Sequence, residues 1–102
     1  MLAIVVNKIN EPGSIQLREI DAPQPESNQV LIESAAAAVN FPDLLQIRGK
    51  YQIIPEIPFI PGKEAAGVVT AVGSDVQHIQ LGDRVLVEVD YGAFAEQVTA
   101  DV

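Results

Sequence analysis

The sequence predicts a mainly β domain, built as a barrel or a sandwich of short strands with one small helix. Short apolar runs alternate with turn residues such as Gly, Pro, Asn and Asp along the whole chain. A single segment, residues 40–49, has the pattern of a helix. The chain has 102 residues, 48% of them hydrophobic, which is enough for one core and not for two.

Three strands are expected in the first 38 residues. The apolar run Leu2–Val6 is the first, and Ile15–Ile20, in which apolar and polar residues alternate, is the second. Residues 22–29 carry two prolines among polar residues and are expected to form a loop. Val30–Ala38 begins with alternation and ends in four alanines, which alone would also suit a helix. The alternation favours a strand.

Residues 40–49 predict a helix of about two turns. Asn40 is suited to cap it, Pro42 suits its first turn, and Asp43 places negative charge near its N-terminus. Gly49 is suited to end it. The apolar face of this helix is expected to consist of Leu44, Leu45 and Ile47.

The remaining chain reads as one extended segment and three strands. Residues 53–62 contain three prolines, which exclude a helix and a central strand, so we expect an extended surface segment. Strands are predicted at Glu64–Val72, Arg84–Val89 and Ala93–Thr99.

Composition excludes several classes of function. The net charge of −8 disfavours nucleic acid and anionic membrane surfaces as partners. The chain has no cysteine, which removes disulfides and thiolate metal ligands and fits a cytoplasmic protein. No apolar run approaches the roughly 18 residues needed to span a bilayer.

The glycines do not form a nucleotide-binding motif. No two are separated by a single residue, so the Gly-x-Gly-x-x-Gly fingerprint is absent. Gly62-Lys63 is followed by Glu64, which rules out a Walker-type sequence. The chain alone is therefore not expected to bind a dinucleotide through the usual fold.

Several motifs, in order, resemble the medium-chain dehydrogenase/reductase superfamily. They are Ala38-Val39-Asn40-Phe41-Pro42-Asp43, Arg48-Gly49-Lys50-Tyr51, Pro58-Phe59-Ile60-Pro61-Gly62-Lys63-Glu64-Ala65-Ala66-Gly67-Val68-Val69, Val72-Gly73, Leu81-Gly82-Asp83-Arg84-Val85 and Gly92-Ala93-Phe94-Ala95-Glu96. The resemblance implies that residues 1–102 form the N-terminal part of a GroES-like catalytic domain, a partly open β-barrel. The Rossmann domain of that family is not present in the chain, which we therefore expect to be a domain fragment.

The resemblance also favours the zinc-free, quinone oxidoreductase (zeta-crystallin-like) branch. Zinc-dependent relatives have a cysteine in place of Asn40 and a histidine in place of Lys63, and a protonated lysine is not a zinc ligand. They also insert a four-cysteine lobe where residues 89–92 run directly into Ala93. Lys63 differs from the smaller residues usual in the quinone oxidoreductase branch.

The resemblance implies five site residues. Tyr51 and Lys63 are the expected catalytic residues, and both are also expected to contact substrate or cofactor together with Asn40, Asp43 and Glu64. Other interpretations stay open for three of these residues. Asn40 can act only as a helix cap, and Tyr51 can be a surface side chain that packs on residues 53–62, the proline segment. Lys63 can be a solvated lysine paired with an acid, or it can contact a cofactor phosphate. Glu64 is expected to orient its neighbours, and Asp43 to act as a charge at the helix start.

The implied function is hydride transfer from NADPH or NADH to a quinone or an α,β-unsaturated carbonyl, performed by a full-length parent. The isolated chain is expected to be inactive and to bind neither cofactor nor zinc. The parent is expected to be a cytoplasmic homo-oligomer without nucleic-acid or membrane partners. The alternative is a stand-alone GroES-like binding module, such as a co-chaperonin, without enzymatic activity.

Overall fold

The computed structural model describes all residues, 1–102, as two antiparallel sheets and one short helix. A two-stranded sheet has the order β1-β2, and a four-stranded sheet has the order β5-β4-β3-β6. In chain order the elements are β1 (Leu2–Val6), the 3-10 turn η1 (Pro12–Ser14), β2 (Ile15–Glu19), β3 (Gln29–Ala38), α1 (Phe41–Ile47), β4 (Glu64–Val72), β5 (Arg84–Glu88) and β6 (Gln97–Asp101). None of the helices has the length and hydropathy needed to cross a bilayer.

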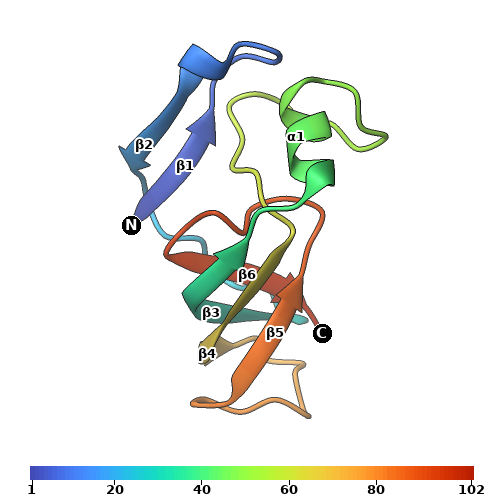
Figure 1. Cartoon of the computed structure of the whole chain (residues 1–102). Helices are drawn as coiled ribbons and strands as arrows, with labels where there is room; N and C mark the ends of the chain where they lie inside the picture. Colours follow the sequence, from blue (N-terminus) through green and yellow to red (C-terminus); the bar gives the residue numbers. More distant parts are fainter.

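The two sheets form a partly open arrangement. In Figure 1 the hairpin of β1 and β2 lies above the four-stranded sheet, and α1 stands beside it at the same end. No strand ladder connects the hairpin to the four-stranded sheet; its β-bridges to the rest of the chain are Ala3 with Ala95 and Val6 with Phe59. The predicted mainly β, partly open fold with one short helix is confirmed.

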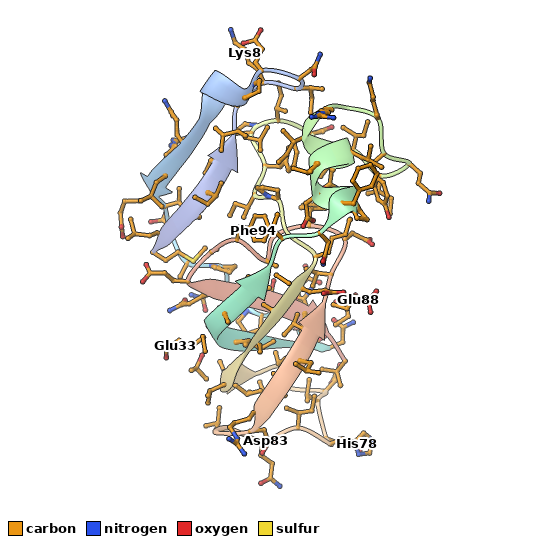
Figure 2. All side chains as sticks on the ribbon, in the orientation of Figure 1. Lys8, Glu33, His78, Asp83, Glu88 and Phe94 are labelled. Atoms are coloured by element: carbon orange, nitrogen blue, oxygen red, sulfur yellow. The ribbon has the colours of Figure 1, made fainter.

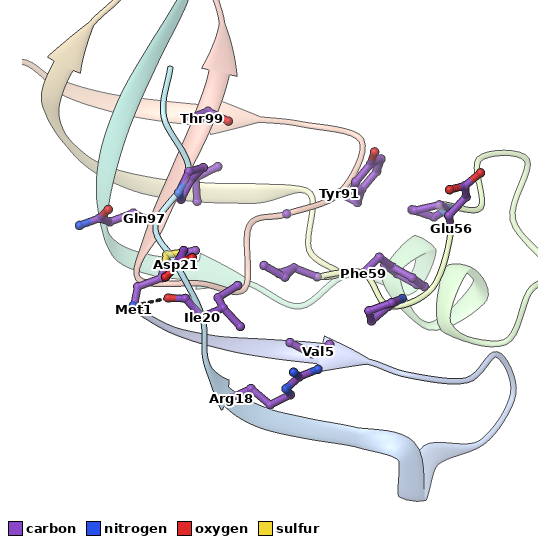
Figure 3. A pocket seen from close by; sticks show the side chains of 16 residues that line it. Met1, Val5, Arg18, Ile20, Asp21, Glu56, Phe59, Tyr91, Gln97 and Thr99 are labelled. Atoms are coloured by element: carbon purple, nitrogen blue, oxygen red, sulfur yellow. Dashed lines mark hydrogen bonds between the residues drawn. The ribbon is translucent and has the colours of Figure 1, made fainter. Parts of the chain in front are cut away.

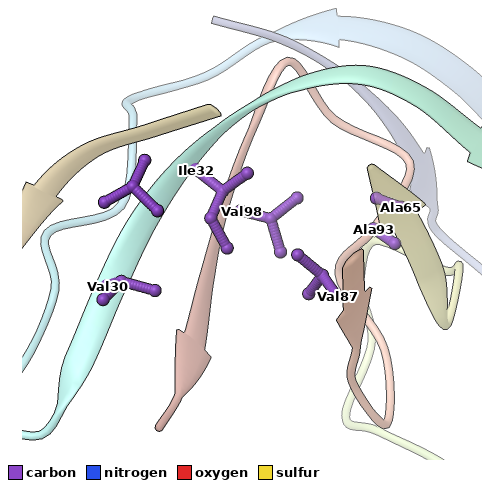
Figure 4. Packing of buried hydrophobic residues seen from close by; sticks show 7 residues of the cluster. Val30, Ile32, Ala65, Val87, Ala93 and Val98 are labelled. Carbon is purple, nitrogen blue, oxygen red and sulfur yellow. The ribbon is translucent and has the colours of Figure 1, made fainter. Parts of the chain in front are cut away.

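The hydrophobic core packs against one face of the four-stranded sheet, and alternate residues of the strands build it. All four strands contribute, and the loop before β6 adds one alanine (Figure 4). The members of this cluster are Val30, Ile32, Ala65, Val69, Val87, Ala93 and Val98. Because β3 shifts register between Ser34 and Ala36, its last residues, Ala35–Ala38, leave this core and are exposed.

The prediction for the last strand was wrong in its bounds. β6 begins at Gln97 and not at Ala93. The backbone N–H groups of Ala93 and Phe94 donate to the carbonyls of Gly62 and Pro61, at 3.1 and 3.0 Å. Residues 93–96 therefore run past the start of β4 and along β1, where Ala95 bridges Ala3, and the ladder with β3 forms only after them.

The proline segment, residues 53–62, was correctly predicted to be neither a helix nor a central strand, but it is not confined to the surface. Phe59 is 4% exposed and exchanges two backbone hydrogen bonds with Val6, at 2.8 and 3.1 Å. Pro61 is buried as well. This segment carries part of the contact between the two sheets.

The predicted apolar face of α1 is only partly buried, since Leu45 and Ile47 are half-buried whereas Leu44 is exposed. The side chains that face the interior are the polar Asp43 and Gln46, both 0% exposed. Leu44 is 43% exposed and Phe41 is 67% exposed. Gln46 can be buried because it donates to carbonyls of other segments, and Asp43 accepts from the backbone N–H of Asn40 at the helix start; an apolar pattern along the helix does not report such partners.

Candidate active site

The end of β3 and the start of β4 bring two of the expected site residues together. Ala38, the last residue of β3, pairs with Glu64, the first residue of β4. Asn40 follows two residues later, and its Nδ2 donates to Glu64 Oε2 at 3.0 Å. The Asn40 side chain is therefore held against β4.

Asn40 also occupies the cap position of α1, but the side chain that supports this end of the helix is Asp43. Asp43 Oδ2 accepts a hydrogen bond from the backbone N–H of Asn40 at 2.8 Å. This is the reciprocal half of a capping box. Asn40 thus stands at the helix start, as the cap interpretation expects, and its contact with substrate or cofactor stays a prediction.

Lys63 is held by two neighbours. Its Nζ donates to the carbonyl oxygen of Asp90 at 2.6 Å and lies 4.5 Å from the centroid of the Tyr51 ring. It forms no ion pair with a carboxylate, because the salt bridges of the chain involve only Met1 with Glu19 and Lys8 with Glu11. An ammonium has three donors. The Asp90 carbonyl takes one of them, so Lys63 can still donate to a ligand.

One side chain of this region was missed by the sequence interpretation. Gln46 is fully buried, and its Nε2 donates to the carbonyls of Ile53 and Asp90, at 2.9 and 3.3 Å. It ties α1 to the proline segment and to the loop after β5. Asp90 is also the acceptor of Lys63, so Gln46 and Lys63 share one carbonyl. No sequence signal marks a glutamine among apolar helix residues as a buried hydrogen-bonding centre.

Two buried oxygens of this helix have no hydrogen-bond partner, Asp43 Oδ1 and Gln46 Oε1. Asp43 reaches Asn40 only through Oδ2. Its position behind the helix start fits a structural role better than direct contact with a ligand.

The largest cavity of the chain lies elsewhere. It has a volume of about 700 Å³ and opens between the hairpin of β1 and β2 and the strand β6 (Figure 3). Arg18, Phe59, Tyr91 and Thr99 are among its lining residues, whereas Asn40, Tyr51, Lys63 and Glu64 are not. The polar cluster around Lys63 is therefore an open surface site, which a second structural unit would have to cover to exclude water.

No group of three or more His, Cys, Asp or Glu side chains is placed to hold a metal ion. The single histidine, His78, is exposed in the loop before β5, far from Glu88 and the helix end of the sheet (Figure 2).

The partly open β fold with one short helix is the architecture expected of a GroES-like domain. The family described as "Alcohol dehydrogenase GroES-like domain" matches residues 26–101. The chain belongs to this family and, with it, to the medium-chain dehydrogenase/reductase superfamily. The family resemblance and the GroES-like fold expected from the sequence are confirmed.

Over most of its length the chain is similar to several known proteins. The chain is 38% identical over 93 residues to an alcohol dehydrogenase of Moraxella sp. (strain TAE123), covering 91% of this chain and 27% of the relative. It is 39% identical over 100 residues to quinone oxidoreductase-like protein 2 of Mus musculus, covering 97% and 28%. The solved quinone oxidoreductase of Escherichia coli complexed with NADPH superposes with a TM-score of 0.90 at 34% identity, covering 98% and 31%.

The chain thus spans between about a quarter and a third of the length of these relatives. Whatever the whole relatives do rests largely on residues outside the matched part. The alternative of a co-chaperonin-type module is not favoured, because the relatives and solved structures named above are described as oxidoreductases or dehydrogenases.

Proposed function

We propose that this chain forms the substrate-side half of the active site in a zinc-independent, NAD(P)H-dependent oxidoreductase. Its substrate is a quinone or an α,β-unsaturated carbonyl compound. The observation that carries the proposal is the Lys63 ammonium, which is held against Tyr51 and the Asp90 carbonyl and keeps donors free. Family resemblance places this lysine where zinc-dependent relatives have a metal-binding histidine.

The residues around Lys63 suit a nicotinamide and a carbonyl substrate. A bound NAD(P)H supplies the hydride. The Asn40 amide, oriented by Glu64, is proposed to contact the carboxamide of a nicotinamide or a polar group of the substrate. The dinucleotide itself needs a second domain, since the chain lacks the glycine fingerprint.

Lys63 would act on the carbonyl oxygen of the substrate. As hydride arrives, negative charge grows on that oxygen, and a donor fixed in advance stabilises this charge without having to reorganise. The Asp90 carbonyl and the Tyr51 ring fix the ammonium in this way. The Tyr51 hydroxyl is proposed as a second donor to the same oxygen or to the nicotinamide ribose.

Relatives support the proposed chemistry. Their names include quinone oxidoreductase-like protein 2 and, in Caenorhabditis elegans, a mitochondrial enoyl-[acyl-carrier-protein] reductase that is 42% identical over 78 residues. Quinone reduction and enoyl reduction both deliver hydride to a carbon conjugated with a carbonyl. NADPH is the cofactor named for the solved Escherichia coli neighbour, and we propose NADP(H) for the parent of this chain.

An activity assay separates the proposed function from its competitors. The parent, in which this domain is joined to a nucleotide-binding domain, is expected to oxidise NADPH with a simple 1,4-quinone or an enone as acceptor. The 102-residue chain alone is expected to show no turnover above a buffer control, because it lacks the dinucleotide fingerprint. If the parent instead oxidises primary alcohols with NADP⁺ and ignores quinones and enones, the proposed substrate class is wrong.

A further inference from the structure

The buried side chain of Gln46 contacts both of the segments that hold Lys63. A carboxamide has two N–H donors. In Gln46 they donate to the carbonyl of Ile53 at 2.9 Å and to that of Asp90 at 3.3 Å. The Asp90 carbonyl is also the acceptor of the Lys63 ammonium. Ile53 lies two residues after Tyr51, whose ring centroid is 4.5 Å from the same ammonium. One side chain thus reaches both neighbours of Lys63.

The segment that carries Tyr51, residues 51–58, depends on Gln46 for its hydrogen bonding. Its two flanks are anchored by the backbone, because Lys50 N donates to a carbonyl of α1 at 2.8 Å and Phe59 N donates to one of β1 at 3.1 Å. Between these anchors the segment makes no backbone–backbone hydrogen bond. The bond from Gln46 Nε2 is its only hydrogen bond.

The loop that carries the Asp90 carbonyl, residues 90–92, is held in the same way. Backbone hydrogen bonds of 2.8 and 3.1 Å anchor its two flanks to Lys63 and to the residue before it. Residues 90–92 themselves make no backbone–backbone hydrogen bond. The two hydrogen bonds that reach this loop come from Gln46 and Lys63, and both end on the Asp90 carbonyl. A carbonyl oxygen has two lone pairs. Gln46 can therefore fix the direction of this oxygen and leave one lone pair for Lys63.

The burial of Gln46 indicates that its two donors are what matters at this position. The side chain is 0% exposed, and its Oε1 has no hydrogen-bond partner. Burying an acceptor without a partner costs free energy. An apolar side chain of the same length would fill this place without that cost. The gain from a glutamine here comes from the donors that reach the two segments around Lys63.

We propose that Gln46 is a positioning residue for the Lys63 ammonium, an inference that rests on the proposed function of Lys63 as a donor to the substrate oxygen. Gln46 acts through the Asp90 carbonyl and the segment of Tyr51, and not by contact with substrate or cofactor. A donor stabilises a developing oxyanion best when it is fixed in advance. A displacement of about 1 Å can cost a large part of the rate. Without Gln46 the Asp90 carbonyl and the Tyr51 ring can shift, and the ammonium shifts with them, although its charge is kept.

The Gln46→Met variant of the parent enzyme tests the proposal. Methionine has a similar size, suits a helix, and removes both donors together with the unpartnered oxygen. Hydride transfer from NADPH to a quinone, followed by stopped flow, is expected to slow by about tenfold. The loss is smaller than the roughly 100-fold expected of Lys63→Met, because the ammonium remains. The cofactor dissociation constant is expected to change by less than about threefold. Gln77→Met makes the same change at an exposed glutamine whose side chain forms no hydrogen bond, and this control is expected to behave as the unmodified enzyme does.

A double-mutant cycle separates an effect on Lys63 from a general effect on the structure. The Lys63→Met variant has no ammonium to position, so adding Gln46→Met is expected to slow it by less than about threefold. A further loss of about tenfold would show that Gln46 acts by another route and would overturn the proposal. An undiminished rate in Gln46→Met beside a slow Lys63→Met overturns this inference alone and leaves the proposed function standing. An undiminished rate in Lys63→Met ends the proposed role of Lys63, and this inference with it.

Thermal unfolding followed by circular dichroism shows that each variant is folded. If Gln46→Met is not, Gln46→Asn takes its place in the same cycle. Asparagine keeps the carboxamide but is too short to reach both carbonyls, so the same pattern of rates is expected. Failure of both variants to fold would assign Gln46 to stability alone and would overturn the proposal.

Discussion

In the parent oxidoreductase, the Lys63→Met variant is expected to reduce a quinone about 100-fold more slowly, with little change in cofactor affinity. Methionine keeps the length of the side chain and removes the ammonium. The variant therefore loses the donor that Asp90 and Tyr51 hold in place. Loss of one donor to a developing oxyanion typically costs about this factor in turnover. Stopped-flow measurement of NADPH oxidation gives the hydride-transfer step, and fluorescence titration gives the cofactor dissociation constant.

Lys50→Met is the matched control, because Lys50 is an exposed lysine next to Tyr51 that makes no side-chain contact of the kind seen for Lys63. It is expected to behave as the unmodified enzyme does. If Lys63→Met weakens cofactor binding instead of hydride transfer, Lys63 contacts a cofactor phosphate. If neither quantity changes by more than about threefold, Lys63 is a solvated side chain, and Asn40 and Tyr51 carry the proposed chemistry.

A second large effect is expected on stability at Gly67. This residue lies buried in β4 between β3 and β5, and a Cβ atom placed on it would lie well under 3.0 Å from the backbone carbonyl of Glu33. A carbonyl in a central ladder cannot move away without breaking its hydrogen bonds. Gly67→Ala is therefore expected to lower the free energy of unfolding by about 3 kcal/mol, a large fraction of the 5–15 kcal/mol typical of a whole domain.

Urea unfolding followed by circular dichroism measures this loss. Gly13→Ala is the control, since a Cβ at Gly13 meets no atom within 4 Å and its backbone angles suit alanine. That substitution is expected to be neutral or to stabilise the chain by about 0.4–1 kcal/mol, through lower entropy of the unfolded state. Equal effects at the two positions would show that the close approach of β3 and β4 at Gly67 is not as tight as described.

Local sequence patterns were sufficient to predict the position of most strands of the fold. β1 and β4 have the predicted bounds, and β2, β3 and β5 differ by one residue at one end, because alternation and flanking turn residues act within the strand itself. The last strand was misplaced because residues 93 and 94 bond to carbonyls of residues 61 and 62, more than thirty positions earlier. The pattern of apolar and polar residues within the strand does not encode these long-range hydrogen bonds.

The buried face of α1 shows the same limit. Leu44, Leu45 and Ile47 predict an apolar face, but the residues of the helix that are completely buried are Asp43 and Gln46. Gln46 is buried because the carbonyls of Ile53 and Asp90 reach it, and Asp90 is 44 residues away in the sequence. The buried polar side chain depends on the tertiary arrangement of three segments, which periodicity does not encode.

The candidate site was found through family motifs and not through local chemistry. Asn40 and Glu64 are 24 residues apart and meet because β3 and β4 pair. Lys63 and Tyr51 meet because the proline segment returns to the start of β4. The structure brings these four residues together in two contacts, while their proposed roles in binding and catalysis stay predictions.

The central claim is that this domain serves a metal-independent reduction of a quinone or an α,β-unsaturated carbonyl compound. It is tested most directly by measuring zinc content and quinone reductase turnover on one sample of the parent. The sample is first dialysed extensively against a chelator. With Asn40 and Lys63 at the positions of metal ligands in zinc-dependent relatives, we expect well under one zinc per chain and unchanged NADPH-dependent turnover. Turnover that disappears on chelation and returns with one equivalent of zinc would contradict the account.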